Sequence, residues 1–315
     1  MPDGPEPGLA EAVLGGARTL TRPQVIAAAG IDPEEGERLW RALGFPEPAD
    51  DDVLFTDRDV EAVRVMQQLG DAGLLPPRVR EAVARAVAQD MSRLAEWQVG
   101  MLRTVLAGPA GERSPADLAA ALVPELGRLQ DYVWRRHLAA ALERAAPGAA
   151  DSDTRPLAVG FADMVGFTRA TRRRSAAELD DLLERFSART AGVIAEGRGR
   201  IVKTVGDEVL FVADDAATAA GIALALDEQV AADDLLPPLR IGLAAGEVLA
   251  RFGDVFGEPV NIAARLTAQA RPGTVLVDRE VAAALDGDER FRVRRLRSRS
   301  VRGYRHLQLH ALSRA

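Results

Sequence analysis

The chain has 315 residues, 47% of them hydrophobic and 28% charged, a balance typical of a globular protein with room for two domains. Its formal net charge of −7 argues against a non-specific nucleic-acid binder, and the absence of cysteine excludes disulfides, thiolate catalysis and cysteine-ligated zinc. The first residues do not resemble a signal peptide and no run of about 18 apolar residues occurs, so we expect no membrane span and a cytoplasmic location.

Residues 1–144 predict an all-helical domain. Thr56 suits the N-cap of one helix, because two aspartates and an apolar stripe at helical spacing follow it. Apolar residues recur at the same spacing in two longer stretches, 77–106 and 115–144. Phe45 and Trp97 are expected in the core of this bundle.

Residues 145–156, rich in Ala, Pro, Gly and Asp, predict a linker. After it, residues 157–315 follow the order strand, helix, two strands, helix, strand, which is a ferredoxin-like α+β arrangement. Ser175 and Glu178 have the spacing of a capping box at the start of the first helix. A tight turn at 205–207 joins the second and third strands.

Two aspartates mark the ends of neighbouring strands. Asp163 ends the first strand in FADMVGFT, and Asp207 lies at the hairpin turn in KTVGDEVL. Both carboxylates are therefore expected at one edge of the sheet, where paired Asp oxygens suit magnesium. Two metals there can activate an attacking oxygen and stabilise a leaving one. Taken singly, either acid is better explained as a cap or a turn residue.

Four further polar residues each allow an ordinary structural explanation. Lys203 lies four residues before Asp207 on the same strand, where a solvated edge lysine is common. Asn261 and Arg265 are four apart on a predicted helix and share one face, from which Arg can grip phosphate oxygens in a planar fork. Asp254 lies in the glycine-rich turn RFGDVFGEPVN.

The six residues in this order resemble the class III adenylyl cyclases. FADMVGFT resembles the first metal motif of that family, and KTVGDEVLF resembles the second, including the lysine. GDVFGEPVNIAARL resembles the segment with the second adenine-selecting residue and the transition-state Asn and Arg, and RSRSVRGYRHLQLHAL resembles the closing strands. The similarity covers residues 156–312, and the joint pattern is far more specific than any single motif.

The resemblance implies the cofactors and the substrate. Asp163 and Asp207 would hold two divalent cations, Mg²⁺ or Mn²⁺. Lys203 and Asp254 would read the adenine ring, so the expected substrate is ATP and the expected product is 3′,5′-cyclic AMP. Guanine would leave both contacts unmade, and a site with buried polar groups left unpaired rejects an analogue strongly.

The resemblance also implies roles for three residues outside the metal and base contacts. Asn261 would orient the ribose, Arg265 would neutralise charge on the α-phosphate, and Arg251 would contact the terminal phosphates. In the family the metal acids of one chain face the other site residues of a second chain. All of them occur in this chain, so a homodimer would have two equivalent shared sites.

The N-terminal half resembles the helical regulatory domain of certain actinobacterial cyclases, including the pH-responsive type. This implies control by a small-molecule, lipid or proton effector. TRPQVIAAAGIDPEEGERLWRALGFP and the later FTDRDVEAVRVMQQLGDAGLL also resemble winged-helix regulators of the MerR kind. A plain helical dimerisation bundle explains any single helix there better than either.

Two other functions compete with catalysis. A cyclase-fold domain can bind nucleotide without turnover, although such a domain would be free to lose its metal acids or its arginine. A DNA-binding regulator is the other alternative, but the acidic balance and the lack of a clear basic recognition helix count against it, and we expect no nucleic-acid partner.

Overall fold

The computed structural model describes residues 8–107, 114–144, 154–167, 171–172, 174–251 and 253–315. Contacts divide the chain into two compact units, Met1–Ala146 and Pro147–Ala315. Within the described ranges, none of the helices combines the length and apolar character that a membrane span requires.

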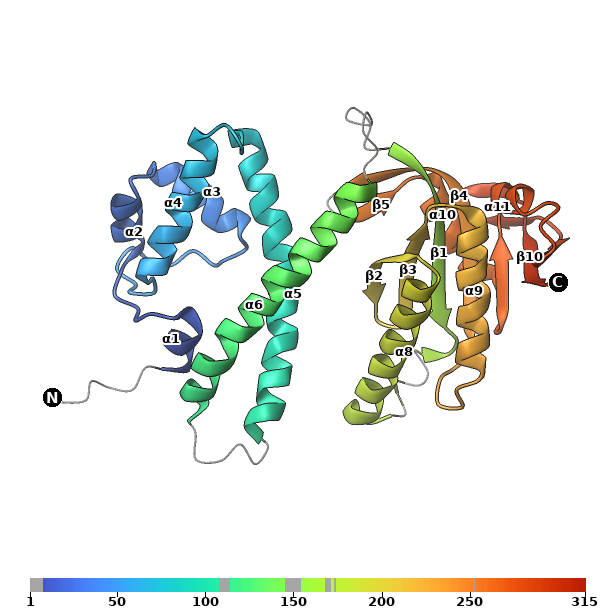
Figure 1. Cartoon of the computed structure of the whole chain (residues 1–315), viewed down its shortest axis with the longest axis horizontal. Helices are drawn as coiled ribbons and strands as arrows, with labels where there is room; N and C mark the ends of the chain where they lie inside the picture. The colour runs from blue at the N-terminus through green and yellow to red at the C-terminus, as the bar shows by residue number, and fades with distance from the viewer. Residues whose placement is uncertain (1–7, 108–113, 145–153, 168–170, 173, 252) are drawn as a thin grey trace. The chain divides into compact units, whose positions relative to one another are not determined.

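The first unit is helical, as the sequence predicts (Figure 1). Thr56 and Asp59 form a capping box at the start of the fourth helix. The small core around Val25, Phe55 and Val60 lies among the short helices. The helices are α1 (Leu9–Leu14), α2 (Arg22–Ala29), α3 (Pro33–Ala42), α4 (Asp57–Asp71), α5 (Pro77–Ala107) and α6 (Pro115–Arg144).

The expected burial of Phe45 and Trp97 is wrong. The Trp97 side chain on α5 is 65% exposed, and Phe45, which stacks on Trp40 at 4.5 Å, is 49% exposed. Helical periodicity identifies an apolar face but not the chain that covers it. In this unit the short helices cover little of α5 and α6.

The second unit begins with the predicted ferredoxin-like order. Its first six elements are β1 (Thr154–Met164), α8 (Ala176–Glu196), β2 (Arg200–Val205), β3 (Glu208–Ala213), α9 (Ala216–Ala231) and β4 (Leu239–Arg251). Ser175 and Glu178 form the expected capping box of α8. The second half contains β5 (Asp254–Phe256), α10 (Glu258–Gln269), β6 (Thr274–Val277), α11 (Arg279–Ala284), β7 (Phe291–Arg295), β8 (Arg299–Val301), β9 (Tyr304–Leu307) and β10 (His310–Arg314).

The predicted linker 145–156 overlaps the first strand. Residues 145–153 lie outside the described residues, and residues 154–156 belong to β1. Pro156 looks like a break in the sequence because it has no N–H to donate. At this point, however, β1 pairs with β4 alone, since its pairing with β3 begins at Ala158. A proline is tolerated where only one side of the strand is paired.

The main sheet has the strand order β2-β3-β1-β4-β6-β10-β7, with β5 paired to β4 and a separate β8–β9 hairpin. Helices α8 and α9 cover one face, where Phe186, Ile222 and Ile241 are buried together. Helix α10 covers the other face, where Phe161 and Ala263 share a second core. Successive residues of a strand point to opposite faces, so β1 contributes to both cores.

Helix α10 lies unusually close to β4 at Gly242. A Cβ atom built on Gly242 would lie 2.4 Å from the backbone oxygen of Ala263 and 2.4 Å from the backbone nitrogen of Thr267. The Thr267 hydroxyl donates to the carbonyl oxygens of Ala263 at 2.9 Å and of Phe161, on β1, at 3.3 Å. Only glycine therefore allows this helix to reach both central strands.

Gly242→Ala should destabilise the second unit by about 2–3 kcal/mol, because the added methyl group meets backbone atoms that cannot rotate away. Urea denaturation of the full chain measures the loss. Gly221→Ala is the matched control: it lies inside α9, its Cβ would meet nothing within 4 Å, and it should be neutral or slightly stabilising. Equal effects of the two substitutions would contradict the close contact.

A buried acid caps α11. Asp278 accepts hydrogen bonds from the N–H groups of Val281 at 2.8 Å and Ala245 at 3.4 Å. Burial nevertheless raises the pKa of Asp278 from 3.8 to about 6. Because the folded-state pKa is the higher one, the stability contributed by this carboxyl group is complete below pH 3.8 and is lost as the pH rises through about 6.

Asp278→Asn should therefore gain stability relative to the unsubstituted chain between pH 4 and pH 7.5. The asparagine oxygen can still accept from Val281 and carries no buried charge. The relative gain should approach roughly 3 kcal/mol, in proportion to the pKa difference. Urea denaturation of both proteins across this pH range measures it, and a pH-independent difference would show that Asp278 does not titrate as described.

Candidate active site

Three acidic residues meet where β1 ends and the β2–β3 hairpin turns. Asp163 is paired in register with Glu208, the first residue of β3. Asp207 precedes Glu208 in the turn, and its carbonyl oxygen accepts a hydrogen bond from the N–H of Met164 at 3.1 Å. Gly206, at φ +60°, supplies the left-handed turn conformation that most residues avoid. The structure thus brings Asp163 and Asp207 together, as the strand order predicts.

The electrostatics of this strand end favour a cation. Asp163 is buried. Burial, and then the neighbouring charge of Asp163, raise the pKa of Asp207. The same two causes, with the charge of Asp207 added, raise the pKa of Glu208. Like charges at close range disfavour ionisation, so a bound cation would relieve the repulsion among these carboxylates.

Arg240 is a residue of this site that the sequence reasoning missed. It lies on β4 directly across from Asp163, and its Nε donates a hydrogen bond to the Asp163 carboxylate. Its positive charge also lowers the pKa of Asp207 and of Glu208, against the larger effect of burial. The only sequence signal is an arginine among apolar residues at the start of a strand, which indicates nothing until the register is known.

Asp163 and Asp207 suit a metal ion whose other ligands come from water or from a bound substrate. Among the described residues, no group of three or more Asp, Glu, His or Cys side chains is arranged to hold a metal. Magnesium commonly binds to one or two carboxylates and completes its octahedron with water and substrate phosphates. Asp163 and Asp207 therefore match a metal that arrives with a nucleotide better than a closed structural metal site.

Lys203 and Asp254 form the second pair of the site. The Lys203 Nζ on β2 donates to the Asp254 Oδ2, at the start of β5, over 2.5 Å. Burial would raise the pKa of Asp254, but hydrogen bonds from Lys203 and from the Val255 N–H lower it. Both side chains remain partly exposed, at 40% and 29%, so a ligand can reach them.

Lys203 is the only lysine of the chain, against 39 arginines. Every other position with a permanently charged basic side chain has arginine, so the lysine distinguishes this position. An ammonium is a compact donor on a flexible stem, whereas arginine presents a planar fork. The bias is visible in the sequence and could have singled out Lys203 without any resemblance.

Asn261 and Arg265 lie one turn apart on α10. Asn261 is exposed, and Arg265 is half-buried. The Nε of Arg265 is buried and has no hydrogen-bond partner among the described residues. An unpaired buried donor is costly, so an acceptor that reached this nitrogen would stabilise the folded chain. Tyr304 packs in the same apolar cluster as Leu266 of α10. Burial and then the charge of Glu258 raise the pKa of Tyr304, against the opposing charge of Arg265.

Arg251 is the last residue of β4 and pairs with Asp254 across the β4–β5 turn. Apart from Asn261 and Arg265 on α10, the structure thus gathers the predicted residues into two groups. The acids stand at one end of β1, while Lys203, Asp254 and Arg251 meet around β5. Asp163 pairs with Arg240 near the start of β4, whereas Asp254 pairs with Arg251 at its end, so the two groups lie toward opposite ends of that strand.

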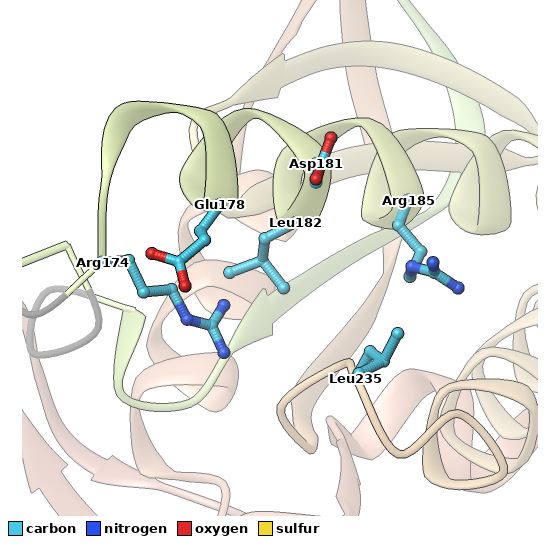
Figure 2. Close-up of a pocket in the computed structure, with 6 residues that line it drawn as sticks. All are labelled: Arg174, Glu178, Asp181, Leu182, Arg185 and Leu235. Atoms are coloured by element: carbon cyan, nitrogen blue, oxygen red, sulfur yellow. The ribbon is translucent and has the colours of Figure 1, made fainter.

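A cavity beside α8 contains none of these residues (Figure 2). It measures about 250 Å³, which is small for a nucleotide. Two arginines, Arg174 and Arg185, and two acids, Glu178 and Asp181, line it, so their charges offset each other. This hollow does not suit a polyanion, and the candidate active site is the open surface described above.

Comparison with known proteins gives two family matches. Residues 150–314 match the adenylate and guanylate cyclase catalytic domain. Residues 8–142 match the adenylate cyclase regulatory domain. Together the two matches cover nearly all of the described residues.

Similar proteins occur in several actinobacteria. An adenylate cyclase of Streptomyces coelicolor is 44% identical over 306 residues, covering 90% of this chain and 78% of the relative. An adenylate cyclase of Glutamicibacter nicotianae is 37% identical over 327 residues, covering 97% and 81%. A pH-sensitive adenylate cyclase of Mycobacterium tuberculosis is 37% identical over 274 residues, covering 81% and 67%.

Proposed function

Because the chain belongs to the adenylate and guanylate cyclase family, we propose that it is an adenylate cyclase. It would convert ATP into 3′,5′-cyclic AMP and pyrophosphate. In this step the ribose 3′-oxygen loses its proton and bonds to the α-phosphorus, while the bond from that phosphorus to the bridging oxygen breaks. The observation that carries the proposal is the hydrogen bond between Lys203 and Asp254.

The family includes both adenylate and guanylate cyclases. The Lys203–Asp254 pair favours adenine over guanine. Adenine presents an acceptor at N1 and a donor at its exocyclic amine. Lys203 can donate to the first, and Asp254, held ionised beside it, can accept from the second. Guanine presents a donor and an acceptor in the opposite places. Both side chains would then be left unpaired beneath the base, which costs more than a missing apolar contact.

Asp163 and Asp207 would hold up to two divalent cations, Mg²⁺ or Mn²⁺. When bound, the metals supply charge stabilisation for the attacking and leaving oxygens. The raised pKa values of Asp207 and Glu208 support this assignment, because burial and then the charge of Asp163 disfavour their ionised forms, and a cation would stabilise those forms. Arg240, already bonded to Asp163, would hold that carboxylate in place as the nucleotide arrives.

The remaining groups act on the sugar and phosphates. Arg265 would neutralise the charge that builds on the α-phosphate, which supplies the acceptor its buried Nε lacks. Asn261, one turn earlier, would orient the ribose. Arg251, beside Asp254, would contact the terminal phosphates. Most of the acceleration would come from positioning and charge neutralisation rather than covalent chemistry.

A second copy of the chain would complete each site. Among the described residues, 19 of the 22 exposed large hydrophobic side chains belong to the first unit. Helix α6 spans 30 residues, yet Ala119 is its one buried residue. A helix with an exposed apolar face gains most of its stability from packing against another surface. A second copy of the chain would supply that surface, which supports a homodimer. Val205 and Phe256, two of the remaining three, each lie two residues from a site residue.

The first unit would regulate the second. We assign residues 1–144 to a regulatory and dimerisation domain and residues 157–315 to the catalytic domain. An apolar cavity of about 1110 Å³ lies between the end of α3 and the middle of α5, lined by Phe45, Met91 and Val99 among others. Its size and lining support control by a small apolar molecule such as a lipid. The relative named as pH-sensitive makes a proton the alternative effector.

The full chain incubated with ATP and Mn²⁺ should form cyclic AMP, while Asp163→Ala and Arg265→Ala should each abolish it. Mixing the two inactive variants should restore up to about a quarter of the activity, because half of a random mixture is heterodimer and each heterodimer keeps one intact site. Differently tagged chains purified as the heterodimer isolate that species. A verified heterodimer without activity would contradict the shared site.

Lys203 offers a test of base recognition that does not depend on turnover. Reductive methylation modifies lysine and the N-terminal amine, so Lys203 is the sole side-chain target. ATP with Ca²⁺ should slow its modification, measured by mass spectrometry, and GTP should protect far less. Lys203→Ala with Asp254→Ala should cut the ATP-over-GTP preference in kcat/KM by about 100-fold or more. Equal protection by both nucleotides would contradict the assignment.

A further inference from the structure

Glu208 is the third acidic residue at the end of β1, beside the two proposed metal ligands. Asp163 is paired in register with Glu208 on β3 and, on its other side, with Arg240 on β4. Residues paired in this way across neighbouring strands point to the same face of the sheet. The side chains of Glu208, Asp163 and Arg240 therefore form a row across three strands, and Asp207 immediately precedes Glu208 in the turn.

This row lies on the face of the sheet that α10 covers. Phe161 and Leu210, two residues away from Asp163 and Glu208 along their strands, are both buried in the core that α10 closes. Because successive residues of a strand alternate between faces, Asp163 and Glu208 point to the same side as those two apolar residues. Gly242, two residues after Arg240, is the point where α10 touches β4. All three members of the row thus share one face.

Glu208 has no structural partner that would explain an acid at this position. It is half-buried, and in the part of the chain that the structure describes its carboxylate forms neither an ion pair nor a side-chain hydrogen bond. The guanidinium of Arg240 is already bonded to Asp163. Like charges on directly opposed residues destabilise a sheet, and burial of an unpaired charge is costly. A neutral residue at position 208 would therefore cost the metal-free fold less.

The charges of the row match one divalent cation. With the three carboxylates ionised, Arg240 offsets one negative charge and leaves two. The acids of the described ranges include no group of three that is arranged to hold a metal directly. A magnesium-like ion keeps several of its water molecules, and groups that bond to a metal's ligands commonly change its affinity 10- to 100-fold. Glu208 is placed to act on such a water rather than as a third direct ligand.

We propose that Glu208 is a positioning residue of the metal site, whose carboxylate accepts a hydrogen bond from water on the cation held by Asp163 and Asp207. Its charge would also strengthen the attraction of the site for that cation. The inference rests on the proposed function for the existence of the metal site. It goes beyond that function because the resemblance assigns no role to Glu208, and because the cost of the third acid in the metal-free chain becomes the source of its affinity for the cation.

The test measures Mn²⁺ binding to the full chain without nucleotide, so that only ligands from the protein and water contribute. Electron paramagnetic resonance follows the loss of the free Mn²⁺ signal during the titration. Glu208→Gln keeps the size of the side chain and removes its charge, and it should weaken Mn²⁺ binding by about 10-fold or more. The Mn²⁺ concentration that gives half-maximal formation of cyclic AMP should rise by a similar factor.

Two further variants separate the charge at this position from other effects. Asp227→Asn is the matched control, because Asp227 is also a half-buried acid whose pKa is raised by burial and then by the charge of Glu228. It lies on α9, which covers the other face of the sheet, and its substitution should leave the Mn²⁺ affinity unchanged. Glu208→Asp retains the charge and should bind Mn²⁺ within about threefold of the unsubstituted chain.

Urea denaturation in metal-free buffer adds a readout that a merely structural residue would move in the opposite direction. Glu208→Gln removes a half-buried, unpaired charge from beside two other acids, so its unfolding midpoint should be higher than that of the unsubstituted chain. Addition of Mn²⁺ should raise the midpoint of the unsubstituted chain more than that of the variant, because the ion binds only the folded state and binds the variant less tightly.

Several outcomes would overturn the role of Glu208. They are an unsubstituted chain that does not bind Mn²⁺, an unchanged affinity in Glu208→Gln, an equal loss in Asp227→Asn, and a lower metal-free midpoint for Glu208→Gln. The proposed function fails separately: if the unsubstituted chain binds Mn²⁺ but forms no cyclic AMP, that function is wrong, whereas the titration still decides the role of Glu208. If cyclic AMP forms and Glu208→Gln binds Mn²⁺ normally, the enzyme assignment stands and the role of Glu208 is wrong.

Discussion

The close contact between α10 and β4 at Gly242 is the constraint on which the site depends. Without a side chain at that position, the helix backbone rests on the central strands, and Thr267 links it to β1. The same helix begins two residues after β5 ends, so its position also fixes Asp254 relative to Lys203. Its outer side supports the β8–β9 hairpin. The contact at Gly242 thus helps to place Asp254, Arg265 and the β8–β9 hairpin relative to one another.

Several local features are predictable from the sequence because each depends on neighbours in the chain. The capping box at Ser175 and the ferredoxin-like order follow from short-range spacing, and both are confirmed. The proximity of Asp163 and Asp207 follows from the order of strands. These are patterns that periodicity, turns and topology determine together.

The features that the sequence could not predict depend on the register of paired strands or on which surface packs against an apolar helix face. Arg240 meets Asp163 only because β1 and β4 pair with a particular offset, and a shift of one residue would turn it to the other face. The strand β5 and the helix α11 have three and six residues, too few for periodicity to reveal. Trp97 lies on an apolar stripe, but the sequence does not say which chain covers that stripe.

The site is defined by groups that the chain leaves unsatisfied in complementary ways. At the end of β1, three acidic residues have more negative charge than Arg240 alone offsets, and burial raises the pKa values of two of them. On α10, the buried Nε of Arg265 has no acceptor among the described residues. A nucleotide with its metal carries both missing partners, cations for the carboxylates and phosphate oxygens for the guanidinium. Such a ligand would be held strongly, because each of its two parts would relieve a cost already present in the folded chain. A nucleotide without metal, or a metal without phosphate, relieves only half of that cost, so binding of the two should be mutually dependent.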